Sequence, residues 1–155
     1  HSINVIYSGT MSAAMEASLE NIPSIGFSLL DYSFDADFDA SSDWISQIIG
    51  HVLRKGIHSS KLLNVNIPRL GRKEIKGIRV CRQAEGNWVE EFKEGKDPRN
   101  ETYYWLTGQF VCQDDGEDTD LFALSSGYIS VVPSGHDLTI HHAIVENKDF
   151  ENLLS

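Results

Sequence analysis

In the first half of the chain, segments whose apolar residues recur at helical spacing alternate with segments whose apolar residues are typical of strands. Residues 11–20 are rich in Ala, Met, Leu and Glu, which are strong helix formers, and predict a helix. A short apolar run at 24–30 predicts a strand that is buried on both faces. Apolar residues at helical spacing predict a second helix over 43–56, and alternation predicts a second strand at 62–68. This order of helices and strands predicts an α/β fold with a parallel sheet.

The helical period disappears after residue 76, where extended segments take over. The predicted elements are strands at 78–83, 87–92, 103–111 and 127–133, a short helix at 120–125 capped by Thr119 and Asp120, and a helical segment at 140–154. The segments 87–92 and 103–111 carry more aromatic residues than a small domain needs, and a Pro-containing turn at 97–100 lies between them. They predict an arm that buries its face on another subunit, or alternatively a hairpin that packs on its own sheet.

Charge and composition limit the classes of partner. The 155 residues fit one domain, of which 41% are hydrophobic, and the net charge is −10. Such an acidic chain lacks the basic stripe that a nucleic-acid duplex requires, and no apolar stretch in it reaches the length of a bilayer span. Cys81 and Cys112 are too few for a disulfide framework and are expected to be reduced and buried. We therefore expect a cytoplasmic protein without a nucleic-acid duplex or a membrane as partner.

The segment Ser8-Gly9-Thr10 lies where the first predicted helix begins, and it is the candidate binding site of the first half. The first N–H groups of a helix have no partner within the helix, and the helix dipole adds partial positive charge there. Two hydroxyls and a flexible Gly at this place suit a phosphate or another oxyanion. The alternative is an ordinary N-cap, in which Ser8 or Thr10 only closes the end of the helix.

Two acidic segments, 31–42 and 114–120, and the pair His141-His142 are the places where a metal ion could be considered. The spacing of the aspartates fits no calcium loop, and solvated loops are the expected structure of both segments. Adjacent histidines on a helix point in different directions and make poor joint ligands. We therefore expect no metal ion at any of these three places.

Six blocks, in the same order along the chain, carry a resemblance to a known family. They are Tyr7–Glu16; Ile22–Leu29; Leu63–Pro68; Arg82-Gln83 with Trp88; Asp97–Arg99 with Tyr103–Gly108; and Thr119-Asp120 through Gly127–Pro133 to Asp137–Thr139. Each block is weak alone, but together they run from about residue 3 to about residue 139. The chain resembles the SurE family of 5′/3′-nucleotidases.

The resemblance implies a Rossmann-like three-layer α/β/α core with a protruding β-hairpin and a swapped C-terminal element that builds homodimers or homotetramers. Residues 1–76 would form the C-terminal part of the core, and residues 77–155 the hairpin arm and an oligomerisation region that returns to the core. The implied activity is a phosphohydrolase that removes phosphate from nucleoside monophosphates with Mg²⁺ or Mn²⁺. Ser8, Gly9 and Thr10 would then bind the substrate phosphate.

The chain departs from the family pattern at the catalytic centre. Family members carry an N-terminal Asn-Asp-Asp-Gly block, a serine after it and an asparagine just before the Ser-Gly-Thr region, and none of these is found here. The run 114–116, Asp-Asp-Gly, imitates the aspartate pair but lies on the hairpin side, and Asn4 matches a family position that is not a ligand. The chain thus resembles the C-terminal part of the family's length, with catalytic residues and metal ligands expected upstream of His1.

Two further possibilities stay open at this point. The chain could be a catalytically inactive fragment that acts as an oligomerisation or anion-binding module. Arg82 and Trp88 could help to hold the nucleoside, although packing of the hairpin explains both residues equally well.

Overall fold

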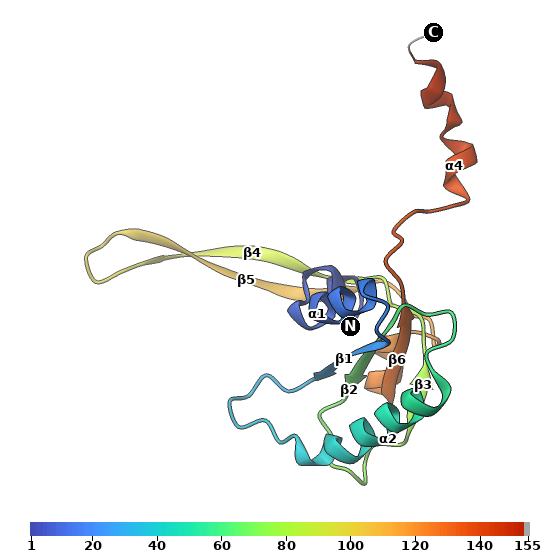
Figure 1. Ribbon diagram of the computed structural model, residues 1–155. Coiled ribbons are helices and arrows are strands. Elements are labelled where there is room, and N and C mark those ends of the chain that lie inside the picture. The colour runs from blue at the N-terminus through green and yellow to red at the C-terminus, as the bar shows by residue number, and fades with distance from the viewer. Residues whose placement is uncertain (154–155) are drawn as a thin grey trace.

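A mixed four-stranded sheet forms the centre of the molecule, whose computed structural model describes residues 1–153. The strands, in spatial order, are β1 (Ser24–Leu29), β2 (Leu62–Ile67), β6 (Ile129–Ser134) and β3 (Ile78–Val80). The expected parallel arrangement holds for β1 with β2 and for β3 with β6, and it is wrong for the pair between them, because β6 is antiparallel to β2 (Figure 1). Residues 68–77 form turns rather than the crossover helix that a parallel neighbour requires, so the chain runs back after β2.

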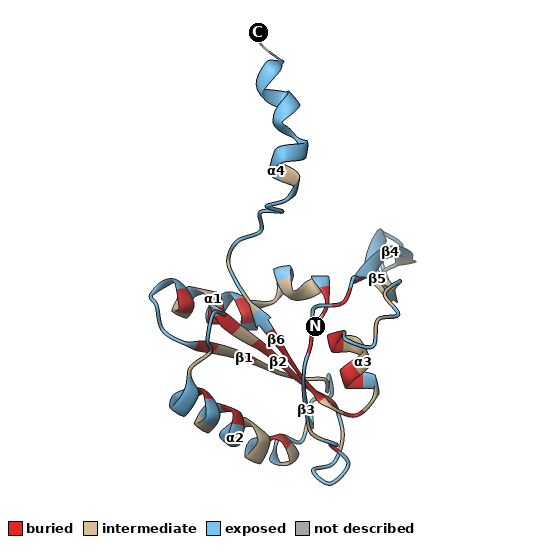
Figure 2. Cartoon of the chain, turned by 90° about the vertical axis from the view of Figure 1, so that its right-hand side faces the viewer, coloured by how far each residue is buried: buried red, intermediate tan, exposed pale blue. Residues whose placement is uncertain are grey.

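Two helices, α1 (Gly9–Leu19) and α2 (Asp39–Lys55), cover opposite faces of this sheet (Figure 2). Alternate residues of β2 serve the two faces, as the pleat of a strand requires. Leu62 packs with Met11 and Ala14 of α1. On the other face, Val65 and Ile67 belong to the core that α2 contacts (through Ile48, Trp44 and Ile45). The described residues therefore form a three-layer α/β/α arrangement.

A close approach between α1 and β1 depends on Gly26. A Cβ atom at this position would lie 2.6 Å from the sulfur of Met11, which is itself buried. Ser24, two residues earlier on the strand, donates a hydrogen bond of 2.7 Å from its hydroxyl to the Ala14 carbonyl. These contacts fix the first half of α1 against the strand, and with it the place where the helix begins.

The arm consists of β4 (Gly86–Lys96) and β5 (Thr102–Cys112), which pair in antiparallel register from Gly86–Cys112 to Lys96–Thr102. Figure 1 shows the pair projecting well beyond the sheet. The two extended pieces expected from the sequence are therefore one long hairpin. Most of its large apolar side chains are exposed, whereas Phe110 near its base is half-buried and makes an edge contact with the His1 ring.

The remaining elements are the 3₁₀ segment η1 (Ile3–Tyr7), α3 (Asp120–Ser125), α4 (Ala143–Glu146) and the 3₁₀ segment η2 (Lys148–Asn152). α4 and η2 replace the single helix expected over 140–154 and extend away from the sheet (Figure 1). Residues 154 and 155, where that predicted segment ends, lie outside the described residues.

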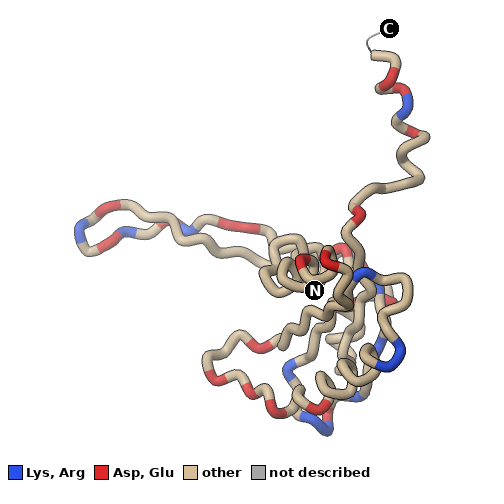
Figure 3. Tube along the Cα trace, in the orientation of Figure 1, with Lys and Arg blue, Asp and Glu red and all other residues tan. Residues whose placement is uncertain are grey.

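Acidic side chains recur along the arm, the loop before α2 and the C-terminal segment, and in the described part Lys and Arg form no continuous stripe (Figure 3). Among residues 1–153, no helix is both long enough and apolar enough to cross a bilayer.

Candidate functional site

The start of α1 combines an N-cap with an open backbone. Ser8 is the N-cap, and its hydroxyl oxygen accepts a hydrogen bond of 3.2 Å from the Met11 N–H. The backbone carbonyl of Ser8 accepts a bond of 2.9 Å from the Ser12 N–H, which is the first regular bond of the helix. The ordinary capping role of Ser8 is therefore confirmed, as the alternative interpretation of this segment expected.

The cap leaves room for an anion. Gly9 and Thr10 are exposed, and a Cβ atom placed on Gly9 would meet nothing within 4 Å. The Ser8 hydroxyl accepts one bond but keeps its own O–H for donation. Free N–H groups and partial positive charge at a helix start suit a phosphate group. Because residue 9 is a glycine, no side chain at that position stands between a phosphate and these N–H groups.

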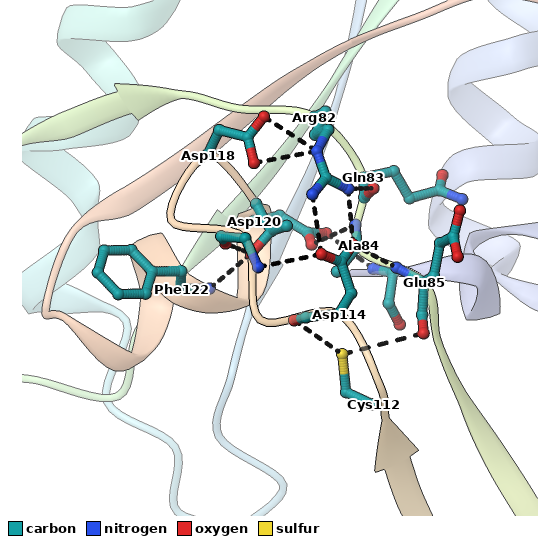
Figure 4. Close-up of polar contacts among 12 residues, drawn as sticks. Arg82, Gln83, Ala84, Glu85, Cys112, Asp114, Asp118, Asp120 and Phe122 are labelled. Atoms are coloured by element: carbon teal, nitrogen blue, oxygen red, sulfur yellow. Dashed lines mark hydrogen bonds and ion pairs between the residues drawn. The ribbon is translucent and has the colours of Figure 1, made fainter.

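A buried carboxylate, which the sequence indicated only as a helix cap, is bonded to the segment that precedes this helix start. Asp120, labelled in Figure 4 among its polar contacts, is fully buried. It accepts a hydrogen bond of 2.7 Å from the Ser2 N–H and one of 3.0 Å from the Ala84 N–H. The capping role belongs to Thr119, whose hydroxyl oxygen accepts from the Phe122 N–H at 3.2 Å. Sequence gives no signal for the long-range role of Asp120, because its two partners are backbone groups that any residue could supply.

Polar side chains also occupy the sheet face that α1 covers. Asn64 and Asn66 are buried, and the Asn66 amide donates a bond of 3.0 Å to the Asn64 side-chain oxygen. Ser130 lies opposite Asn66 in the strand register and is fully buried. The backbone nitrogen of His1 lies 3.4 Å from the Asn66 side-chain oxygen. The segment that leads into η1 thus lies against a polar patch of the core.

The root of the arm is held by an ion-pair cluster around Arg82. Its guanidinium donates to Asp114 at 2.6 and 2.8 Å and to Asp118 at 3.0 Å (Figure 4). The Arg82 guanidinium, followed by the Glu85 N–H, holds the pKa of Asp114 well below its usual range. Arg82 is therefore engaged in fixing the hairpin, and the idea that it binds a nucleoside has no support in this geometry. The segment 114–120 is likewise more ordered than the solvated loop that we expected.

The described residues do not fit a catalytic metal ion. Within residues 1–153, no group of three or more His, Cys, Asp or Glu side chains is arranged to hold one. Asp114 is bound to Arg82, and His141 contacts Asp137 at 2.7 Å. The two cysteines are free: Cys81 is buried, which raises the pKa of its thiol, and Cys112 is half-buried.

Fold and site together define an α/β protein with a candidate oxyanion site at a helix N-terminus and a long hairpin arm. The chain belongs to the SurE family: the family model described as "Survival protein SurE" matches residues 1–90. The resemblance inferred from the six sequence blocks is thereby confirmed.

Three relatives define how much of the family the chain represents. It is 57% identical over 143 residues to "5′-nucleotidase SurE" of Flavobacterium psychrophilum, covering 92% of this chain and 56% of that protein. It is 59% identical to the protein of the same name from Christiangramia forsetii, covering 92% and 55%. The solved structure of the SurE protein from Aquifex aeolicus superposes with a TM-score of 0.80 at 36% identity, covering 97% of this chain and 60% of that one. The chain therefore spans less than two thirds of the length of these relatives.

Proposed function

We propose that this chain supplies the phosphate-binding helix start and the assembly arm of a 5′/3′-nucleotidase, a phosphohydrolase that releases phosphate from nucleoside monophosphates. The observation that supports this most directly is the open start of α1 at Ser8-Gly9-Thr10, in a chain whose relatives are named 5′-nucleotidases. The divalent cation implied by the family, Mg²⁺ or Mn²⁺, would be held by residues in the part of the relatives that this chain does not span.

In this proposal the residues of the chain stabilise charge. The Gly9 and Thr10 N–H groups and the Ser8 and Thr10 hydroxyls would donate to the non-bridging phosphoryl oxygens, where negative charge gathers as water attacks phosphorus and the nucleoside oxygen leaves. Because α1 is anchored to β1 at Ser24 and Gly26, these donors are fixed before substrate arrives. Preorganised donors of this kind cost no rearrangement at the moment of reaction.

The test uses a chimera that joins this chain to the part of the F. psychrophilum relative that it does not cover. We expect release of inorganic phosphate from AMP that depends on Mn²⁺, and no release by the 155-residue chain alone. Thr10→Ala should lower kcat/KM by roughly 10-fold or more, since removing one donor of such a site costs up to about 10³-fold. Ser46→Ala, which removes an exposed hydroxyl from α2, is the control and should leave the rate unchanged.

Ser8 allows a sharper variant. Ser8→Asp keeps a preferred N-cap acceptor, so the melting temperature should be retained, but its negative charge would repel a phosphate dianion. A stable Ser8→Asp chimera with the parental kcat/KM would show that the phosphate site is misplaced.

The exposed arm supports a second role, homodimer or homotetramer formation. Its aromatic residues lie in the open along both strands: Trp88, Phe92, Tyr103, Tyr104 and Trp105. An apolar surface of this kind marks a protein–protein interface. The test replaces residues 88–110 by an Asn-Gly turn that joins Asn87 to its ladder partner Val111. Light scattering should then give the mass of a monomer, and an unchanged mass would reject the arm as the assembly element.

A further inference from the structure

The carboxylate of Asp120 connects three parts of the chain that are distant in sequence. It starts α3, and its two oxygens accept from the N–H groups of Ser2 and Ala84, which are 118 and 36 residues away. A buried carboxylate without compensating donors is costly, and one with two short bonds is correspondingly hard to displace. Asp120 therefore acts as a cross-link among the segment before α1, the root of the arm and α3.

The Ser2 end of this cross-link holds a strained backbone. Ser2 has φ 52° and ψ −161°, a conformation that is essentially restricted to glycine and costs a non-glycine residue about 1–3 kcal/mol. Such a conformation persists only where its surroundings enforce it. The short bond from the Ser2 N–H to Asp120 is one such restraint, and Ser2 itself is fully buried.

The strained residue determines the course of the chain into the phosphate-binding segment. Ser2 is the residue from which η1 (Ile3–Tyr7) starts, and Ser8 follows η1 directly. The Val5 N–H donates to the Ser2 carbonyl at 3.2 Å, and the Ser8 N–H donates to the Val5 carbonyl at 3.1 Å. A shift at Ser2 is thus passed through two hydrogen-bonded turns to the N-cap of α1.

The Ala84 end fixes the arm. Ala84 is two residues before β4 begins, and the backbone around it is tied to the α3 start by two further bonds, from the Asp120 N–H to the Arg82 carbonyl at 2.9 Å and from the Arg82 N–H to the Asp118 carbonyl at 3.0 Å. The arm root and the start of η1 therefore share one buried anchor.

We propose that Asp120 is a positioning residue that holds Ser2 in its strained conformation and so aligns Ser8-Gly9-Thr10 with the arm. The predicted effect of Asp120 on turnover depends on the proposed nucleotidase function, whereas its structural role does not. Asp120 does not act on substrate itself, because the side chain is fully buried and both oxygens already accept backbone bonds.

Hydrogen exchange of the 155-residue chain tests whether Asp120 fixes the conformation of residues 2–8. In Asp120→Asn, the new amide NH₂ must face one of the two N–H donors, so one bond is lost. We expect the amides of residues 2–8 and 84–86 to exchange roughly 10-fold faster or more, with those of β2 unchanged. Asp118→Asn, which changes the exposed aspartate of the same segment, is the matched control and should leave residues 2–8 unchanged. Unchanged exchange of residues 2–8 in Asp120→Asn would overturn the proposal.

Glycine at position 2 provides the second variant. Ser2→Gly alone should raise the melting temperature by about 2–4 °C, because it removes backbone strain. This measurement on Ser2→Gly remains possible even if Asp120→Asn fails to fold. A lower melting temperature of Ser2→Gly would contradict the backbone strain at Ser2 that the proposal requires. In the nucleotidase chimera, Asp120→Asn should lower kcat about 10-fold with a smaller change in KM, and adding Ser2→Gly should restore part of kcat.

The two proposals fail in different ways. A parent chimera without activity rejects the nucleotidase, while the exchange data still decide whether Asp120 fixes residues 2–8. An active parent whose Asp120→Asn variant keeps its full kcat, despite faster exchange, rejects the positioning role alone. The positioning role is also rejected if Asp120→Asn lowers kcat and adding Ser2→Gly restores none of it. That result is expected if Asp120 acts on the substrate directly.

Discussion

The sheet and the arm are both rich in apolar residues but use them in opposite ways. Leu62 and Val65 on β2 are 0% exposed, whereas Phe92 and Trp105 on the arm are 70% and 66% exposed. Helices cover both faces of the sheet (Figure 2), whereas most of the large apolar side chains of the arm are exposed. A two-stranded hairpin has little stability of its own in water. The apolar residues of the sheet therefore stabilise the fold of this chain, whereas most of those on the arm contribute little to it.

The largest expected effect separates the two regions by stability. Leu62→Ala removes a fully buried side chain that packs on Met11 and Ala14, and should lower the free energy of unfolding by about 2–5 kcal/mol. Trp105→Ala, made on the exposed arm, should change the stability of the monomer by about 0.5 kcal/mol or less. Urea unfolding followed by circular dichroism measures both. Equal losses in the two variants would show that the arm packs on its own chain.

A smaller effect is expected where α1 meets β1. Gly26→Ala forces a methyl group toward the Met11 sulfur and should destabilise by about 1–3 kcal/mol through overpacking. Gly9→Ala is the matched control for stability, because open space surrounds that position and Ala is the better helix former. Thermal unfolding compares the two, and a Gly26→Ala protein as stable as Gly9→Ala would show that the helix does not approach the strand this closely.

Local sequence patterns predicted the elements of the sheet region well, since each depends on nearby residues. The stripe over 43–56 corresponds to α2, whose start moves to Asp39 because the Asp37 side chain accepts from the Asp39 N–H at 2.8 Å and closes the preceding turn. The end at Gly56, with φ 73°, agrees with the prediction. The small-residue segment at 11–20 corresponds to α1, which starts earlier because Ser8 caps it.

Long-range features were not predictable in the same way. The antiparallel direction of β6 follows from the reversal of the chain between β2 and β3 and from the parallel pairing of β6 with β3, which no local pattern records. The role of Asp120 depends on backbone groups at Ser2 and Ala84, and the role of Arg82 on two aspartates more than 30 residues away. Of the candidate site, the sequence indicated the helix start, and it missed the buried anchor behind it.

The arm itself gives the next prediction, for assembly rather than folding. Changing Phe92 and Trp105 together to Ser should weaken self-association by about 10- to 100-fold, because exposed aromatic anchors contribute disproportionately to interfaces. Sedimentation equilibrium measures the dissociation constant, and thermal unfolding confirms that the monomer is intact. Changing the arm residues Thr107 and Gln109 to Ser and Asn is the control, and an equal loss of association there would mean that the arm's apolar character is not what mediates assembly.

The smallest expected effect concerns the junction between the two regions, at the Arg82 cluster. The folded pKa of Asp114 is depressed, first by the Arg82 side chain. A depressed carboxyl pKa contributes stability that is present above the unfolded pKa, about 4, and is lost as pH falls through the folded pKa. Asp114→Asn should therefore increase hydrogen exchange of residues 82–86 relative to the parent by a constant factor from pH 7 to pH 5. That factor should shrink below about pH 4, where Asp114 is protonated in the opened segment, and it should vanish only where the folded Asp114 is protonated as well.

The pH profile of Asp114→Asn also distinguishes the junction from the sheet. Exchange of the β2 amides should be the same in parent and variant at every pH, because the Arg82 cluster holds the arm and not the core. Asp115→Asn, at the exposed neighbouring position, controls for the loss of a negative charge from the same loop and should leave residues 82–86 unchanged. A parent–variant difference that grows on acidification would contradict the sign derived from the depressed pKa, and with it the role of Asp114 as the partner that fixes Arg82.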